Sequence, residues 1–96
     1  MPKSQRPAPA DLTSSWPDTP SSDVAGEAAR QLALRLRQAI GGHSVRGVAD
    51  TAGLDEGTLR NVLSGSRWPD LRTIALLEDA LDASLWPPRA DRRGKR

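Results

Sequence analysis

From residue 23 onward, apolar residues recur at the three- and four-residue intervals that place them on one face of a helix. The predicted helices cover residues 23–40, 45–52, 56–64 and 71–82, and the expected caps of the first and the last are Ser22 and Asp70. The predicted fold is therefore all-α, a compact four- to five-helix bundle. The positions expected to face its core are Val24, Ala28, Leu32, Leu36, Ala39, Ile40, Leu71, Ile74, Leu77, Leu81, Leu85 and Trp86.

Residues 44–65 hold the two shorter helices, which are joined by a tight corner. In the corner, Gly53 is expected to end the first of these helices in a left-handed conformation. The apolar Leu54 follows and is expected to fill the corner. Asp55 can accept a hydrogen bond from the free N–H groups at the start of the helix at 56–64. Ser44 is expected to cap the helix at 45–52 in the same way. Two short amphipathic helices joined by a turn with Gly have the spacing of a helix-turn-helix. Their apolar faces are formed by Val45, Val48, Ala49 and Ala52, and by Leu59, Val62 and Leu63.

The outward face of the second short helix carries small or hydrogen-bonding residues: Glu56, Gly57, Thr58, Arg60, Asn61 and Ser64. A helix with such a face fits the DNA major groove, where its side chains reach base edges. The alternative is a small helical bundle in which this face is merely solvated. Gly47 lies inside the preceding helix at a cost of about 1 kcal/mol relative to Ala, and nothing local explains it.

The two ends of the chain differ in composition from residues 23–88, which are the expected DNA-binding domain. Residues 1–22 hold five of the eight prolines and many Ser and Thr residues, so we expect a disordered tail in which Trp16 is either exposed or docked. Residues 89–96 carry a net charge of +4 and form a basic tail, whereas residues 23–88 carry −2. The tail is either solvated or a DNA-contacting arm, with Arg92, Arg93, Lys95 and Arg96 as candidate contacts.

Composition narrows the chemistry further. The chain has no Cys, which excludes thiolate catalysis and Cys-based zinc sites, and its one His does not supply the several ligands that a metal site needs. No nucleophile–base pair or phosphate-binding loop is visible in the sequence. We therefore expect no enzyme activity, cofactor or metal. No apolar run approaches the roughly 20 residues that span a bilayer, and no signal-peptide core is present, so a cytoplasmic protein without membrane contact is expected.

Several motifs together resemble the lambda-repressor/Cro-like (XRE-type) helix-turn-helix domains, particularly short actinobacterial or actinophage ones. They are Ser-x-Arg-x-Val-Ala at 44–49, Ala-Gly-Leu at 52–54, Thr-Leu-x-x-x-Leu-x-Gly at 58–65, Trp-Pro-Asp-Leu-x-Thr-Ile at 68–74 and Leu-Trp-Pro at 85–87. The resemblance covers residues 44–87, or 32–87 with the end of the first helix. One departure is the Ser-Val-Arg opening of the helix at 45–52, where relatives often have a Gln that contacts a phosphate and supports the recognition helix.

The resemblance implies a sequence-specific transcriptional regulator, of the repressor kind, that binds double-stranded DNA as a homodimer. It places Glu56, Gly57, Thr58, Arg60 and Asn61 at base-reading positions. It also places Ser44, Arg46, Ser64, Ser66, Arg67 and Trp68 near DNA phosphates.

Two other functions remain open at this point. The chain is alternatively the antitoxin of a toxin–antitoxin pair, which would use this domain for autoregulation and bind its toxin as a protein partner. A third possibility is a protein-interaction module in which the helix-turn-helix does not bind DNA.

Overall fold

The computed structural model describes residues 7–92, and every regular element within them is helical. The prediction of an all-α bundle is confirmed, and the predicted bounds of α2 and α3 agree with the structure. The elements are η1 (Pro9–Leu12), α1 (Val24–Ile40), α2 (Val45–Ala52), α3 (Glu56–Ser64), α4 (Leu71–Leu81) and α5 (Arg89–Arg92).

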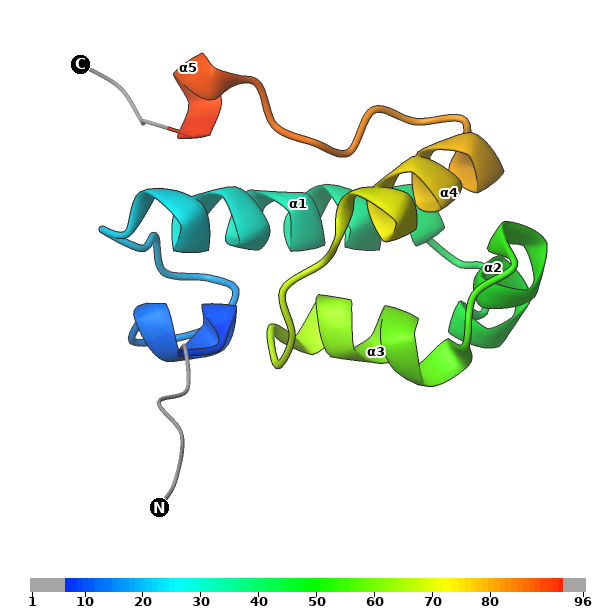
Figure 1. Cartoon of the computed structure of the whole chain (residues 1–96), viewed down its shortest axis with the longest axis horizontal. Helices are drawn as coiled ribbons and strands as arrows, with labels where there is room; N and C mark the ends of the chain where they lie inside the picture. Colours follow the sequence, from blue (N-terminus) through cyan, green and yellow to red (C-terminus); the bar gives the residue numbers. More distant parts are fainter. Residues whose placement is uncertain (1–6, 93–96) are drawn as a thin grey trace.

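The long helix α1 runs through the middle of the molecule (Figure 1). Helix α3 and the short η1 pack on one side of α1, whereas α5 packs against α1 from the other side. Helix α2 packs against both α3 and α4, near the end of α1. The buried core that these helices share is aliphatic: Leu32, Leu36, Ile40, Val48, Ala49, Ala52, Leu59, Val62, Ile74, Leu77 and Leu85.

Each of the four longer helices begins at a side chain that accepts a hydrogen bond from a free backbone N–H group. Ser44, Asp55 and Asp70 cap α2, α3 and α4, and the cap predictions at Ser44, Asp55 and Asp70 are confirmed. The prediction of Ser22 as the first cap is wrong, because the Asp23 carboxylate accepts from the N–H of Gly26. These caps define where α2, α3 and α4 begin.

Three of the predicted core positions are exposed instead. Val24 is 56% exposed and Leu71 is 83% exposed. Each is the first residue of its helix. The apolar pattern therefore begins at a position that the neighbouring helices do not yet cover. Trp86 is 45% exposed and lies at a bend of the chain that follows α4. Its neighbours Leu85 and Pro87 are the buried ones.

The expectation of a disordered tail does not hold for residues 7–22, which we call the N-terminal segment; residues 1–6 lie outside the described residues. Pro9 and Pro17 are buried, and η1 packs against α1. The Trp16 indole N–H donates to the Leu63 carbonyl at the end of α3, 2.9 Å away. A Pro- and Ser-rich composition suggested disorder, but buried proline rings and one docked indole hold this segment on the folded domain.

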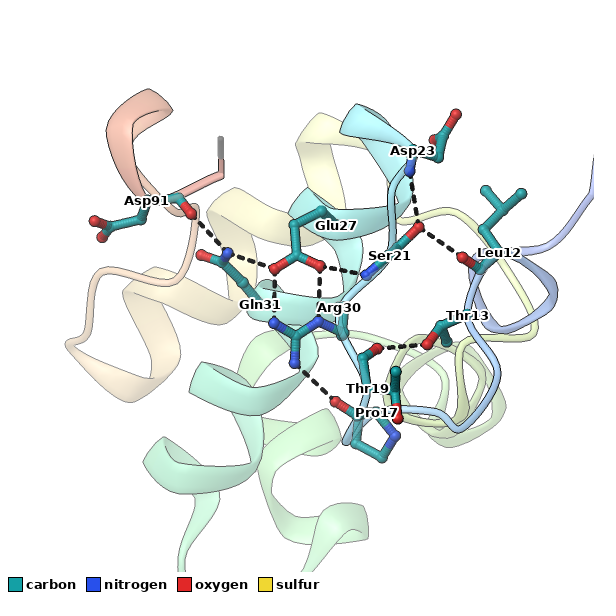
Figure 2. Close-up of polar contacts among 10 residues, drawn as sticks. All are labelled: Leu12, Thr13, Pro17, Thr19, Ser21, Asp23, Glu27, Arg30, Gln31 and Asp91. Atoms are coloured by element: carbon teal, nitrogen blue, oxygen red, sulfur yellow. Dashed lines mark hydrogen bonds and ion pairs between the residues drawn. The ribbon is translucent and has the colours of Figure 1, made fainter. Parts of the chain in front are cut away.

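Glu27, on the first turn of α1, holds the N-terminal segment in place (Figure 2). Its carboxylate accepts from the backbone N–H of Ser21 at 2.8 Å and from the Arg30 guanidinium at 2.6 and 2.8 Å. Arg30 in turn donates to the carbonyl of Pro17. These hydrogen bonds lower the pKa of the Glu27 carboxyl to about 2, the Arg30 hydrogen bond contributing most, even though burial alone would raise it.

The expected basic tail is also partly folded. Residues 89–92 form α5, and Asp91 lies beside α1, where its carboxylate pairs with Arg35 at 2.9 Å and its carbonyl accepts from Gln31. Residues 93–96 lie outside the described residues. Within residues 7–92, no helix is long and apolar enough to cross a membrane.

Candidate nucleic-acid interface

The corner between α2 and α3 is held by short-range hydrogen bonds. Gly53 has φ of 73°, the left-handed conformation that favours glycine, and its N–H points back at the carbonyls of Ala49 and Asp50. The N–H of Leu54 also donates to Ala49, at 2.9 Å. The Asp55 carboxylate then accepts from the N–H of Gly57 at 2.9 Å. The sequence therefore fixes the direction in which α3 leaves the corner.

Helix α3 presents one buried and one open face. Leu59 and Val62 are 0% and 4% exposed and pack into the core. Successive residues of a helix are rotated by about 100°, so the opposite face is centred on Gly57, Asn61 and Ser64, with Arg60 beside them. Gly57, Arg60 and Ser64 are exposed and Asn61 is half-buried. Small residues on this face leave room for a close approach by a large partner.

The remaining two candidate base-reading residues, Glu56 and Thr58, lie on opposite flanks of that face. Both are half-buried. Thr58 lines a groove of about 290 Å³ between the start of α3 and the loop after it, together with Arg67 and Arg72. Thr58 is thus placed towards this groove, whereas Arg60 and Glu56 lie towards the other flank.

Arg60 and Glu56 form an ion pair on the open face of α3. The Arg60 Nε and Nη2 atoms lie 2.7 and 2.6 Å from one Glu56 carboxylate oxygen. The two side chains are 60% and 38% exposed, so water screens the pair, which contributes only a few tenths of a kcal/mol. A base edge that offers two acceptors to the guanidinium can therefore replace Glu56 at little cost.

At the start of α2, Ser44 is used as a cap and Arg46 is exposed. The Ser44 hydroxyl oxygen accepts from the N–H of Gly47 at 2.9 Å. A Cβ atom on Gly47 would lie 2.9 Å from that oxygen, but the oxygen is the end of one flexible side chain, so this contact alone does not require a glycine here. Arg46 is the second residue of α2, at the end of that helix away from the α2–α3 corner, and it is exposed.

The loop after α3, residues 65–70, carries the other candidate phosphate contacts. Ser66 is linked to α3 because its N–H donates to the Asn61 carbonyl, and its hydroxyl lies 2.6 Å from that of Ser64. Arg67 is exposed. Trp68 is half-buried and its indole N–H donates to the carbonyl of Pro7 at 2.9 Å, so this donor is already engaged within the protein.

Around this face, basic and acidic residues are equal in number, but fewer of the basic ones already have a partner within the protein. Residues 44–73 contain four arginines and four acidic residues. Asp55 and Asp70 cap helices, and hydrogen bonds from Thr73 lower the pKa of the Asp70 carboxyl. Among the described residues, Arg46, Arg67 and Arg72 are exposed and form no ion pair. Glu56 pairs with Arg60, and of the four acidic residues only the exposed Asp50 has neither a cap role nor an ion pair, so more positive than negative charge is free to meet an anionic partner.

Of the candidate tail contacts, only Arg92 is described, and it is folded back on the protein. Its guanidinium carbon lies 5.3 Å from the centre of the Trp86 ring, and its Nε donates to the Pro87 carbonyl at 3.0 Å. Helix α5, which contains Arg92, lies across α1 from α3 and away from the open face of that helix (Figure 1). Arg93, Lys95 and Arg96 lie outside the described residues.

Two features near the candidate interface were missed by sequence reasoning. Arg72, which lines the groove beside Thr58, follows the first residue of α4 and was treated only as part of that helix. The N-terminal segment meets the end of α3, and Trp16 in an otherwise polar stretch was the only signal of this. No group of three or more His, Asp or Glu side chains that could hold a metal ion occurs among residues 7–92.

No protein-family model matches the chain, and no curated protein matches it.

Proposed function

We propose that the protein is a sequence-specific DNA-binding transcriptional regulator, acting as a repressor, that inserts α3 into the major groove. The observation that carries the proposal is the open face of α3, on which small residues flank Arg60 on a helix whose direction the capped corner fixes. The resemblance to lambda-repressor/Cro-like domains points the same way. The exposed residues Arg46 and Arg67 come before and after α3 in the sequence. Their proposed partners are the phosphates along the edges of the groove that α3 enters.

Each candidate residue has a role that its chemistry permits. Arg60 donates two parallel hydrogen bonds to guanine O6 and N7, and Asn61 pairs with adenine. Glu56 releases Arg60 on binding and either accepts from cytosine N4 or stays at the N-terminus of α3, where its charge is favourable. Gly57 and Thr58 line the approach, and the groups directed at phosphates are Ser44, Arg46, Ser64, Ser66 and Arg67.

Two copies are expected on one site. A single recognition helix contacts about four to five base pairs, which is too few to define a unique site. A homodimer on DNA would place two such helices about one turn of the duplex, roughly 34 Å, apart. The proposed place of action is accordingly the cytoplasm, on chromosomal or phage DNA.

Selection from a random-sequence DNA library by the full chain tests the proposal. We expect enrichment of a site with two related half-sites separated by about one turn, because both copies present the same face. Recovery of unenriched DNA at all salt concentrations would contradict sequence-specific binding.

A second candidate is a protein-binding helical domain, either an antitoxin or an interaction module. The observation that favours it is a groove of about 650 Å³ lined mainly by apolar side chains, among them Val24, Ala28, Trp68 and Trp86. Exposed apolar grooves of this kind are typical of sites for other proteins. An adjacent toxin gene whose product binds this groove would favour the antitoxin, whereas partner binding without any DNA binding would favour the interaction module.

A further inference from the structure

The N-terminal segment is hydrogen-bonded to the end of α3 and the loop that follows it at three places. The Trp16 indole N–H donates to the Leu63 carbonyl at 2.9 Å. The backbone N–H of Ala10 donates to the Gly65 carbonyl, also at 2.9 Å. Trp68 donates to the carbonyl of Pro7 at the same distance. All three bonds fall on residues 63–68, so two stretches of chain that are far apart in sequence are joined within a few residues.

The Trp16 ring closes directly over Gly65, the residue that ends α3. Gly65 has φ of 74°, and its N–H donates towards the carbonyls of Asn61 and Val62. A Cβ atom at this position would lie 2.5 to 2.9 Å from three atoms of the Trp16 ring. Glycine is therefore required here twice, by the left-handed backbone and by the indole packed against it.

The far end of the N-terminal segment is fixed to α1, so the indole does not rest on a loose chain. Ser21 donates from its backbone to Glu27 and accepts Asp23 N–H on its hydroxyl, which itself donates to the Leu12 carbonyl (Figure 2). Arg30 holds the Pro17 carbonyl, next to Trp16. Because Arg30 and Glu27 have side chains only about a tenth exposed, this attachment is shielded from water.

We propose that Trp16 is a positioning residue for DNA recognition, which holds the end of α3 and the loop after it in the arrangement that DNA contact requires. This inference rests on the proposed function. The residues that the indole holds are next to Ser64, Ser66 and Arg67, the candidate phosphate contacts, and to Asn61, a candidate base contact that bonds Ser66. Contacts to phosphates set the register of a recognition helix, so a small shift of this loop displaces the base-reading side chains.

The test compares the full chain with Trp16→Ala, Trp16→Phe and, as the loss of an exposed apolar side chain elsewhere, Leu34→Ala. Leu34 lies on α1, is 36% exposed and lines neither of the grooves described above. The first readout is amide hydrogen exchange at Gly65 and Ser66, with Gly53 and Leu54 in the α2–α3 corner as an internal reference. The second is the ratio of specific to nonspecific DNA affinity at fixed salt, for the site selected by the wild type.

Trp16→Ala is expected to speed exchange at Gly65 and Ser66 about fivefold or more while leaving the corner amides unchanged, since about one hydrogen bond and its packing are lost. The DNA affinity ratio should fall by a similar factor. Trp16→Phe keeps a ring over Gly65 but loses the N–H, so partial rescue is expected, and Leu34→Ala should change neither readout.

Unchanged exchange at Gly65 and Ser66 in Trp16→Ala would overturn the inference at its structural step. Faster exchange with an unchanged affinity ratio would overturn it at its functional step, because the loop would then be held but not needed for recognition. A wild-type chain that binds all DNA sequences equally would instead overturn the proposed function. Hydrogen exchange at Gly65 and Ser66 does not depend on DNA, so it still tests the structural step in that case.

Discussion

The helix-turn-helix of residues 44–65 and the N-terminal segment of residues 7–22 meet at the end of α3, but different kinds of contact hold them. In the helix-turn-helix, caps and corner hydrogen bonds join residues within five positions of one another, as from Leu54 to Ala49 or Gly57 to Asp55. The bonds that tie the N-terminal segment to α3 and its loop span 47 residues at Trp16 and 61 residues at Trp68. One region is specified locally, and the other exists only once the domain has folded.

This difference assigns the two regions different tasks. A locally determined corner sets the direction of α3, and its open face carries the groups that we propose read DNA. The N-terminal segment adds no group to that face but restrains the end of the same helix. Changes in the segment should therefore alter stability and the position of α3, whereas changes on the open face should alter recognition alone.

The largest expected effect on stability comes from Glu27, which holds the N-terminal segment, and this effect depends on pH. The pKa of Glu27 is about 2 in the folded protein, against an ordinary value of 4.5, so its contribution to stability is fully present above about pH 4.5 and is lost as pH falls towards 2. We expect Glu27→Gln to lower the unfolding free energy by about 3 kcal/mol at pH 7, and by only about 1 kcal/mol at pH 2.5. Urea unfolding at both pH values measures the gap.

Asp79→Asn is the control for this experiment, since Asp79 is exposed on α4 and its side chain accepts no hydrogen bond among the described residues. It should show little change at either pH. A gap between wild type and Glu27→Gln that stays constant with pH would mean that the carboxylate charge does not hold the N-terminal segment.

A smaller effect is expected from two glycines with the same backbone and different surroundings. Gly53 and Gly65 end their helices at φ of 73° and 74°, but a Cβ on Gly53 meets nothing within 4 Å, whereas one on Gly65 meets the Trp16 ring. Gly53→Ala should cost about 1 kcal/mol for the left-handed backbone alone, and Gly65→Ala about 2 kcal/mol or more. Thermal or urea unfolding of both variants gives the difference.

A double-variant cycle identifies the source of the excess cost. In a Trp16→Ala background, Gly65→Ala should cost no more than Gly53→Ala, because the ring that it displaces is gone. Equal costs of Gly65→Ala with and without Trp16 would show that the indole does not restrict this position.

The extent to which sequence predicts each region follows from the range of its contacts. The bounds of α2 and α3, the caps Ser44, Asp55 and Asp70 and the left-handed Gly53 all depend on neighbours along the chain, and the sequence predicted each of them. The exposure of Val24 and Leu71 was not predicted, because a periodic pattern does not say where along a helix the neighbouring helices begin to cover it.

The packing of the N-terminal segment was not predicted either, because it depends on contacts between residues that are far apart in the sequence. Pro9 lies in η1, which packs against α1, and the carbonyl of the buried Pro17 accepts from Arg30, 13 residues away. Composition alone treats such residues as a tail. Sequence spacing also placed Glu56 and Arg60 on one helix face but left open whether they pair, which depends on rotamers. The candidate base-reading residues themselves remain predictions about function.

The most direct test of the central claim, that the open face of α3 reads DNA, is the ratio of specific to nonspecific affinity for Arg60→Ala at one salt concentration, with its melting temperature. Arg89→Ala is the control, because it removes an exposed arginine from α5, across α1 from α3 (Figure 1). The account predicts that Arg60→Ala loses about 1–3 kcal/mol of specific binding and relaxes preference at one or two base pairs. Its melting temperature should hardly change, since the pair with Glu56 contributes only a few tenths of a kcal/mol. An unchanged affinity ratio would contradict the claim and leave Arg60 as one half of a surface ion pair.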